Sequence, residues 1–396
     1  MIAAFPARPA FESILAFLHR DFHEHKFKDG FPPVRQLFFV PSVMGSPPAA
    51  AGPVVLPQLP TEAALAAWLG ITPGRLRWYA DITGRNRKHP EGPLRTYRHR
   101  WIPKPHGRSR LLEIPKTGLK LLQRKILSEL LNHIPAHPSA HGFRPGRSIV
   151  TNAAPHCGKQ IVLRFDLRDF FPSIPAARVY RIFRTFGYPE TVARLLTGLC
   201  TTRLPGDVWN ARPNPAYDGS DHSEWQRLAN RHLPQGAPTS PALANLAAFR
   251  LDRRLTKLAA CVGADYTRYA DDLTFSGSDD LARKAKRFAV RVAVIAAEEG
   301  FTLNYRKTRM MRRGERQHVA GVVVNVRPNL PRKEFDLLKA ILTNCVRKGA
   351  ESENREKCPD FRAHLAGRVS HFAAVNPVRG RKLWAIFDRI VWQPET

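Results

Sequence analysis

The chain has 396 residues, 43% of them hydrophobic, so it is long enough for two or three subdomains and too apolar to be disordered throughout. Its 63 lysines and arginines exceed its 33 aspartates and glutamates by a net charge of +30, which indicates a polyanionic partner. No uninterrupted run of about 18 apolar residues and no basic amphipathic membrane helix is present, so nucleic acid is favoured over a membrane as that partner.

The first sixty residues predict an extension followed by a linker. Prolines and charged residues interrupt "MIAAFPARPAFESILAFLHRDFHEH", which breaks the apolar core of a signal peptide, so we expect a cytoplasmic protein. Three histidines in "HRDFHEH" lack the HExxH arrangement of a zinc site, and a solvated helix face explains them more simply. A Pro/Ala/Gly-rich run at 41–60 is typical of a linker. The five cysteines form no C-x-x-C pair and indicate reduced thiols.

The folded part is expected to begin at Thr61 with a helix that ends at Pro73-Gly74, where a second short helix follows. "YRHRWIPKPHGRSRLLEIP" then predicts a two-stranded ribbon with a basic tip. "KTGLKLLQRKILSELLNHI" has apolar residues near a 3.6-residue period and predicts a long amphipathic helix. The glycine- and arginine-containing segment "AHGFRPGRS" follows as a loop at 140–148.

The next part alternates strands and helices. "QIVLRFDLRDFFPSI" predicts an apolar strand that ends at Asp166, and a helix follows Pro175. The polar composition of 201–232 predicts an exposed insertion. "LPQGAPTSPALANL" places a Gly/Pro turn before a small-residue helix, and "RYADDLTFSG" predicts a hairpin. A helix and two further strands come next, and the chain is helical and basic from Pro331 onward.

Two adjacent acids, Asp271 and Asp272, lie in the middle of this predicted hairpin. At an effective dielectric near 20, two like charges about 4 Å apart repel by roughly 4 kcal/mol. The pair therefore requires either a compensating cation or a turn with both side chains in water. If the strand ending at Asp166 pairs beside the hairpin, three carboxylates converge and suit two divalent ions about 4 Å apart. Mg²⁺ fits such a site because it prefers oxygen ligands and shares its coordination shell with substrate phosphates.

Five segments resemble, in order and approximate spacing, the palm motifs of reverse transcriptases. They are "FDLRDFFPSI", "LPQGAPTSPALANL", "RYADDLTFSG", "GFTLNYRKT" and "GVVVN". "NAAPH" at 152–156 and the wording "LPQGAPTSP" resemble the bacterial retron branch of that family. The VTG tripeptide of retrons corresponds here to Val319-Ala320-Gly321, with alanine in place of threonine, and whether this departure alters priming stays open.

The resemblance implies an α+β right-hand polymerase. An N-terminal extension and linker (1–60) would precede fingers (61–160), a palm with an antiparallel sheet (161–328) and a helical thumb (329–396). Its thumb core would be formed by Leu365, Val369, Phe372, Leu383, Trp384 and Phe387.

The implied activity is RNA-directed DNA polymerisation from dNTPs with two Mg²⁺ ions. The template would be a cognate noncoding RNA whose internal 2′-hydroxyl primes synthesis, so that the product is single-stranded DNA joined to RNA (msDNA). Antiphage defence with a separate effector protein is implied as well. The alternatives are a group II intron-like or diversity-generating reverse transcriptase, or an inactive RNA-binding scaffold. The scaffold would be expected to have lost at least one of the three carboxylates.

Roles for the metal and leaving-group residues also follow from the resemblance. Asp166 and Asp271 would be the principal metal ligands, and Asp272 a secondary ligand or a group that tunes the site. Lys307 would give a proton or positive charge to the departing pyrophosphate, or else contact backbone phosphate within its basic run.

Further roles concern the nucleotide. The ring of Phe171 would lie under the incoming sugar and exclude a 2′-hydroxyl, unless it is a core residue. Lys104 and Arg110 would clamp the triphosphate or contact RNA in general. Gln235 and Gly236 would form the turn through which the backbone approaches the template–nucleotide pair.

Four residues before the first palm strand are candidates for RNA binding. Asn152 and His156 of "NAAPH" would either contact RNA or cap a helix and pack beneath it. Arg144 and Arg147 would either face phosphate or remain in solvent.

Overall fold

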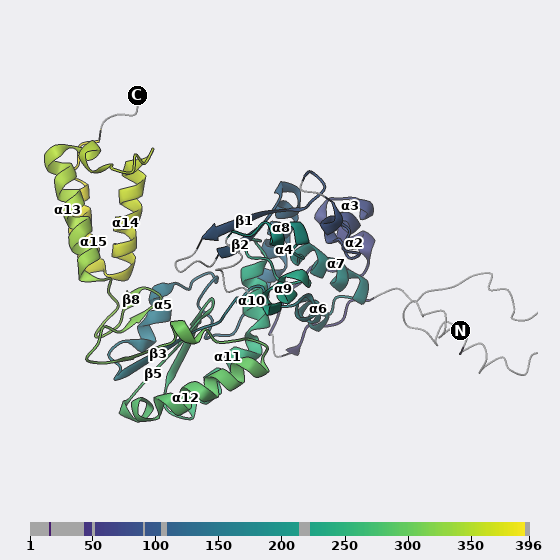
Figure 1. Cartoon of the computed structure of the whole chain (residues 1–396), viewed down its shortest axis with the longest axis horizontal. Coiled ribbons are helices and arrows are strands. Elements are labelled where there is room, and N and C mark those ends of the chain that lie inside the picture. Colours follow the sequence, from purple (N-terminus) through teal and green to yellow (C-terminus); the bar gives the residue numbers. More distant parts are fainter. Residues whose placement is uncertain are drawn as a thin grey trace, which may run out of the picture. The chain divides into compact units, whose positions relative to one another are not determined.

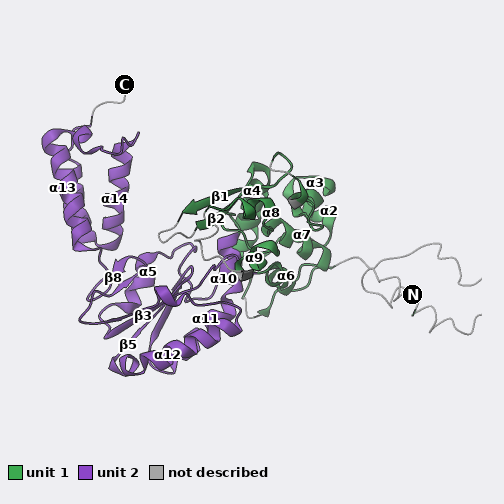
Figure 2. Cartoon of the chain, viewed as in Figure 1, with its two compact units in different colours: residues 1–134, 175–239 green, residues 135–174, 240–396 purple. Residues whose placement is uncertain are grey.

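The computed structural model describes residue 16 and residues 43–49, 52–89, 92–103, 109–213 and 222–392. The histidines at 19, 23 and 25, and most of the predicted extension, lie outside the described residues. The chain forms two compact units (Figure 2), made of residues 1–134 with 175–239 and of residues 135–174 with 240–396. These units divide the chain differently from the fingers, palm and thumb boundaries, which stay a prediction about functional subdomains.

Unit 1 contains helices and a two-stranded ribbon. Its helices are α2 (Glu62–Leu69), α3 (Pro73–Ala80), α4 (Thr117–Glu129), α6 (Ala176–Thr185), α7 (Glu190–Cys200), α8 (Gly206–Asn210) and α9 (His222–Ala229). The ribbon pairs β1 (Tyr97–Pro103) antiparallel with β2 (Ser109–Pro115), as the sequence predicts. Thr61 and Thr72 accept hydrogen bonds at the starts of α2 and α3, which explains where these helices begin.

The expectation of an exposed insertion at 201–232 is wrong at both ends of that segment. Leu204 and Leu228 are buried and form an apolar cluster with Leu111, against which Trp101 and Trp209 pack. His232, at the end of the segment, is also buried. The polar composition misled the prediction because the few apolar side chains in this segment are the ones that face inward.

Unit 2 is built on a four-stranded antiparallel sheet of order β4-β5-β3-β6. Figure 1 labels its strands β3 and β5. Its strands are β3 (Ile161–Asp166), β4 (Asp265–Tyr269), β5 (Asp272–Gly277) and β6 (Arg309–Arg312). The helices and short turns before and around the sheet are α5 (Ile149–Ala153), η5 (Ala154–His156), α10 (Ser240–Ala247), α11 (Phe249–Ala260), α12 (Asp279–Glu298) and η6 (Tyr305–Lys307).

The two faces of the sheet are covered differently. Phe275 of β5 packs edge-on against Phe288 of α12, and Tyr266 of β4 bonds to Asp252 of α11, so these helices cover one face. Because side chains alternate along a strand, Thr267 and Ser276 point to the opposite face, where they meet His156 of η5. Each strand of the pair β4–β5 is therefore anchored on both sides.

The rest of unit 2 is a short hairpin and a helical segment. The hairpin joins β7 (His318–Val319) to β8 (Val322–Val323). The helices are α13 (Arg332–Lys348), α14 (Phe361–Val375) and α15 (Pro377–Phe387). The predicted apolar core of the C-terminal helices is confirmed: Leu365, Val369, Phe372, Leu383 and Phe387 are buried, and Trp384 packs partly buried against them. Helices with an antiparallel sheet confirm the α+β class.

Two expectations about composition can be compared with the described residues. All five cysteines are free thiols, as predicted. Across the part of the chain that the structure describes, the search for a helix with both the length and the apolar character needed to cross a bilayer finds none.

Candidate active site

The end of β3 and the turn between β4 and β5 bring three acids to one edge of the sheet. Asp166 pairs with Asp272 in the β3–β5 register. The amide of Leu167 donates to the carbonyl oxygen of Asp271 over 2.9 Å, which ties the turn to the chain beyond β3. Ala270 has φ +56°, a left-handed conformation that closes the tight turn. The pairing that the sequence predicts between the Asp166 strand and the acidic hairpin is confirmed.

Two cations neutralise part of this acidic edge. Lys307 Nζ lies 2.7 Å from Asp166 Oδ2, and Arg164 Nη2 lies 3.2 Å from Asp272 Oδ2. The Lys307 pair is held in place by the backbone, because the amide of Asn304 donates to the carbonyl oxygen of Asp166 over 2.7 Å. Among the described residues, no cationic side chain lies within ion-pair distance of Asp271.

The electrostatic consequence is concentrated on Asp271. Burial, together with the charges of Asp166 and Asp272, raises the pKa of Asp271 to about 6. Burial also raises the pKa of Asp272 and outweighs the opposing charge of Arg164. An additional cation at this edge would therefore stabilise the ionised form of both groups.

The donor set fits a divalent cation in its chemistry. Three carboxylates at one edge offer the oxygen ligands that Mg²⁺ prefers, and burial together with the two neighbouring acids raises the pKa of Asp271. Within the described residues, no group of three or more His, Cys, Asp or Glu side chains is arranged to enclose an ion. Asp166 and Asp272 instead contact Lys307 and Arg164.

Beneath the hairpin lies a fully buried ionic network that the sequence analysis missed. Arg268 donates through Nε and Nη2 to the two carboxylate oxygens of Asp252, at 2.8 and 2.7 Å. Its Nη1 also donates to Asn245 Oδ1 and to the carbonyl oxygen of Ala270, each at 3.0 Å. Tyr266 donates its hydroxyl to Asp252 over 2.8 Å. The network fixes the turn from below and links it to α10 and α11.

Comparison with known proteins identifies the family to which this site belongs. The model of the reverse transcriptase (RNA-dependent DNA polymerase) family matches residues 102–339, more than half of the chain. Retron Mx65 reverse transcriptase of Myxococcus xanthus is 42% identical over 334 residues, which cover 83% of this chain and 71% of that protein. The chain belongs to the retron reverse transcriptases.

Two further relatives agree. Retron Mx162 reverse transcriptase of Myxococcus xanthus is 36% identical over 347 residues, covering 83% of this chain and 67% of that protein. Retron Ec86 reverse transcriptase of Escherichia coli is 34% identical over 288 residues, covering 72% and 78%. The protein is thus an RNA-directed DNA polymerase with the polymerase fold of this family, whose members use divalent metal ions. Retron enzymes act with a noncoding RNA and make DNA from dNTPs.

The predicted sugar-contacting residue of this reverse transcriptase follows β3. Phe171 is partly buried, and its ring centroid lies 5.6 Å from that of the buried Phe170. Phe170 in turn packs against Phe301 with centroids 5.7 Å apart. The ring of Phe171 therefore rests on the core without being enclosed by it, a position compatible with either of the two predicted roles.

The predicted nucleotide-binding residues of unit 1 lie around β2. The carbonyl oxygen of Gln235 accepts a hydrogen bond of 2.9 Å from the amide of Glu113. Gly236 has φ +132°, and a Cβ on it would lie 2.9 Å from the carbonyl oxygen of Glu113, so only glycine fits this close approach. Arg110 is exposed on β2, opposite Ile102 of β1. Lys104 lies outside the described residues.

The same strand carries a buried ion pair that sequence patterns did not reveal. Glu113 Oε2 lies 3.0 Å from His232 Nε2, and each side chain is only 1% exposed. Burial alone lowers the pKa of His232, but the charge and hydrogen bond of Glu113 outweigh burial and raise it. Their separation of 119 residues hid the pair from local reading of the sequence.

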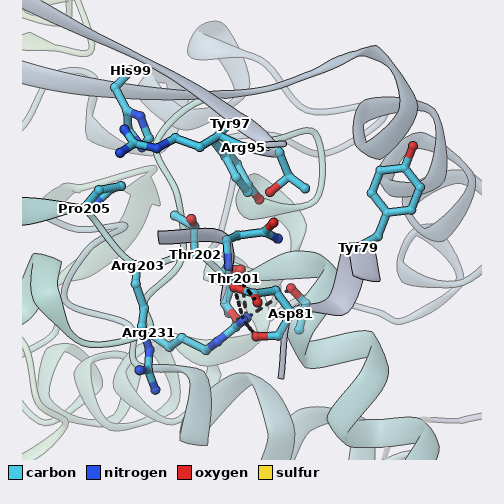
Figure 3. A pocket seen from close by; sticks show the side chains of 13 residues that line it. Tyr79, Asp81, Arg95, Tyr97, His99, Thr201, Thr202, Arg203, Pro205 and Arg231 are labelled. Atoms are coloured by element: carbon cyan, nitrogen blue, oxygen red, sulfur yellow. Dashed lines mark hydrogen bonds and ion pairs between the residues drawn. The ribbon is translucent and has the colours of Figure 1, made fainter. Parts of the chain in front are cut away.

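Unit 1 of the reverse transcriptase also contains a small polar pocket (Figure 3), lined by Arg95, Arg203, Arg231 and Asp81 among others. Arg231 donates to the carbonyl oxygens of Ala80 and Gly198, and so joins the ends of α3 and α7. The cavity of about 30 Å³ holds one or two water molecules and is too small for a nucleotide. We assign this pocket a structural role.

The retron motif "NAAPH" lies inside the protein. His156 is fully buried, and its Nδ1 and Nε2 lie 2.7 Å from the hydroxyls of Ser276 and Thr267 respectively. Thr267 also donates to the carbonyl oxygen of Asn152, whose side chain is 1% exposed. Burial lowers the pKa of His156 to about 4, so the ring is neutral. Direct RNA contact does not fit these positions; packing beneath the hairpin, the second predicted alternative, does.

The two arginines of the preceding loop differ. Arg144 Nη1 donates to the carbonyl oxygens of His137 and Ala140, each at 3.0 Å, so this side chain braces the loop. Arg147 is exposed. Of the two, Arg147 has the side chain available for contact with phosphate.

Proposed function

We propose that this reverse transcriptase copies a cognate structured noncoding RNA into single-stranded DNA that stays joined to the RNA, with an internal 2′-hydroxyl as primer. We further propose two Mg²⁺ ions as cofactors and a role in antiphage defence with a separate effector protein. The observation that carries the catalytic part is the Asp166–Asp272 pairing with the uncompensated Asp271 beside it.

Asp166 and Asp271 would be the principal ligands of the two ions, and Asp272 would support the site from β5. When bound, such ions lower the pKa of the attacking hydroxyl and stabilise charge on the leaving pyrophosphate. The residues themselves hold this edge rigid: the paired strands fix Asp166 and Asp272, and Arg268 fixes the carbonyl of Ala270 next to Asp271.

Lys307 would act on the leaving group. Its side chain is 56% exposed while its ammonium contacts Asp166, so the ammonium can turn from this carboxylate towards a departing pyrophosphate. When the ammonium of Lys307 leaves Asp166, this carboxylate would become available as a metal ligand. The basic neighbours of Lys307 would contact backbone phosphate.

Roles towards the nucleotide are proposed for residues of each unit, taken separately. Phe171 would exclude a 2′-hydroxyl from the incoming sugar, since its ring rests on Phe170 while remaining partly accessible. Arg110, with Lys104, would bind the triphosphate. The Gln235-Gly236 turn, fixed against β2, would present backbone to the template–nucleotide pair.

The retron part of the proposal is supported by the relatives and by the chain's charge. A net charge of +30 suits a long structured RNA bound through its phosphates. Ala320 and Gly321 both have positive φ, +47° and +84°, in the turn between β7 and β8. A β-branched threonine is disfavoured at such a position, so alanine at residue 320 is compatible with the turn.

The test is expression with the noncoding RNA encoded beside the gene. We expect a DNA product whose mobility increases after RNase treatment and whose 5′ end is linked to a 2′-hydroxyl of the RNA. Unrelated structured RNA of equal length is the control and should give no such product. If DNA forms with both RNAs and carries no RNA branch, cognate priming is contradicted while polymerase activity stands.

Defence is tested separately by challenging cells that carry the whole locus with a panel of phages. Protection that disappears in an Asp271→Asn variant would support the proposal. Equal plaque counts with the locus and with an empty vector, for every phage tested, would contradict it.

A further inference from the structure

The loop before α5 contains an aromatic residue in an unfavourable position. Phe143 has φ +61°, in the left-handed region that non-glycine residues seldom adopt, and its side chain is 47% exposed. A bulky exposed residue gains little from burial to offset such a backbone conformation. Strain of this kind persists where the surrounding structure enforces it, and it concentrates at functional sites.

The surrounding structure does enforce it, because the loop is attached to the catalytic hairpin. A Cβ on Gly142 would lie 2.6 Å from the amide nitrogen of Ala270, so the two backbones are in direct contact. The carbonyl oxygen of Gly142 accepts a hydrogen bond of 2.9 Å from Asn245 Nδ2. The amide of His141 donates to the carbonyl oxygen of Arg268 over 2.8 Å. The residues that fix the acidic turn thus also fix the loop.

The attachment directs the ring of Phe143 towards Phe171. The two ring centroids lie 6.1 Å apart with an interplanar angle of 47°, within the range of favourable aromatic pairs. Phe171 also contacts the buried Phe170, with centroids 5.6 Å apart. Phe171 therefore has two aromatic neighbours, one from the core and one from the loop that is tied to the hairpin.

We propose that Phe143 is a positioning residue for sugar selection, which holds the ring of Phe171 so that ribonucleotides are rejected. The inference rests on the proposed role of Phe171. Steric exclusion requires a wall that cannot yield, and a ring supported only by Phe170 could turn away about its side-chain torsions to admit a 2′-hydroxyl. Support from Phe143 restricts that movement, since the loop cannot shift independently of the hairpin.

The test is a double-mutant cycle on nucleotide discrimination. The ratio of kcat/KM for dATP to that for ATP would be measured on one RNA template for wild type, Phe171→Ala, Phe143→Ala and the double variant. We expect Phe171→Ala to reduce the ratio by about 100-fold or more and Phe143→Ala by about 10-fold, mainly through faster ATP use. The double variant should match Phe171→Ala, because a support has no effect once the ring it supports is gone.

The outcomes separate this inference from the function on which it rests. An unchanged ratio in Phe171→Ala would overturn both the sugar-excluding role and the inference. An unchanged ratio in Phe143→Ala, with a reduced ratio in Phe171→Ala, would overturn the inference alone. Additive effects in the double variant would mean that Phe143 acts independently of Phe171, which also overturns it.

Two controls make the result specific. Phe143→Leu keeps much of the bulk and should recover part of the lost discrimination. Phe249→Ala removes another partly exposed phenylalanine of unit 2, 39% exposed on α11, and should leave the ratio unchanged. Binding of the template RNA is measured in parallel. Weaker RNA binding by Phe143→Ala with an unchanged nucleotide ratio would assign Phe143 to the RNA and overturn the proposal.

Discussion

Two acids near the β4–β5 hairpin differ in how their charge is compensated: Asp252 below the turn is paired with Arg268, and Asp271 at the tip has no such partner among the described residues. Below the turn, Asp252 is fully buried and accepts hydrogen bonds from both Arg268 and Tyr266. At the tip, burial and like charges raise the pKa of Asp271 to about 6. Asp252 therefore has a cationic partner within the protein, whereas no cationic side chain among the described residues lies within ion-pair distance of Asp271.

The contrast between Asp252 and Asp271 shows how one hairpin combines a rigid base with an acid that lacks a cationic partner. A buried, bidentate ion pair resists rearrangement because either partner alone would be a desolvated charge. An acid with uncompensated charge stores unfavourable energy that a bound cation relieves. The buried Arg268–Asp252 pair holds the turn rigid. Asp271 can therefore keep its position when no cation is bound.

The largest expected effect is on activity, from the tip. Asp271→Asn should lower DNA synthesis by at least about 10⁴-fold, more than 5 kcal/mol in the barrier, because the proposed metal ligand loses its charge. Stability should stay equal or rise, since repulsion is removed. Single-turnover extension and thermal melting measure the two effects. Asp279→Asn, an exposed acid at the start of α12, is the control. Near-normal synthesis by the Asp271 variant would contradict the proposed role of Asp271 as a metal ligand.

The next effect concerns stability, from below the turn. Arg268→Met should lower the free energy of unfolding by about 3–5 kcal/mol, because Asp252 is left as a buried unpaired charge. Urea denaturation measures it. Replacing Asp252 by leucine in the same chain should recover much of the loss. A loss under about 1 kcal/mol for the single variant would mean that the Arg268–Asp252 pair does not hold the turn in place.

A smaller effect is expected from the cation beside the tip. Lys307→Ala should slow synthesis by about 30-fold, roughly 2 kcal/mol, because positive charge near the leaving group is lost. Stability should change little, since the Lys307 side chain is 56% exposed and an ion pair with one solvent-exposed partner contributes little. Arg306→Ala, the neighbouring exposed cation, is the matched control. Equal losses from both variants, measured by pre-steady-state extension, would assign Lys307 to general phosphate binding.

The smallest effect tests the support on the other face of the sheet. The pKa of His156 is about 4 in the folded protein, against about 6.5 when unfolded, so between these values only the unfolded state takes up the proton. Stability should therefore fall as pH drops from 7.5 to 5, by about 1–2 kcal/mol from this residue. His156→Gln should remove that part of the pH dependence.

Unfolding free energies of wild type and variant at both pH values give the difference. His141, whose pKa is also lowered by burial to about 4, titrates in both proteins and cancels. His133→Gln, an exposed histidine, is the control and should keep the wild-type slope. A variant slope equal to that of wild type would show that folding does not lower the pKa of His156.

The convergence of the three acids at one edge of the sheet was predictable. Asp166, Asp271 and Asp272 stand in motifs whose order and spacing are specific. The β3–β5 pairing and the ribbon of β1 and β2 were likewise readable from apolar runs and turns. The prediction failed at 201–232, where buried Leu204 and Leu228 are too few to outweigh a polar composition.

The family, the acids and the strands that carry them could be inferred from the amino-acid sequence, since they depend on local pattern and motif order. The three-dimensional packing was needed to identify the polar residues that stabilise the fold. Asn, His and Arg suit RNA contact and buried hydrogen bonding equally well in a sequence. Burial distinguishes structural residues from RNA-contacting ones. His156 hydrogen-bonds Ser276, 120 residues further along the chain, and Arg268 is fully buried beneath the turn that it supports. Such contacts depend on packing between distant segments, which no local pattern records.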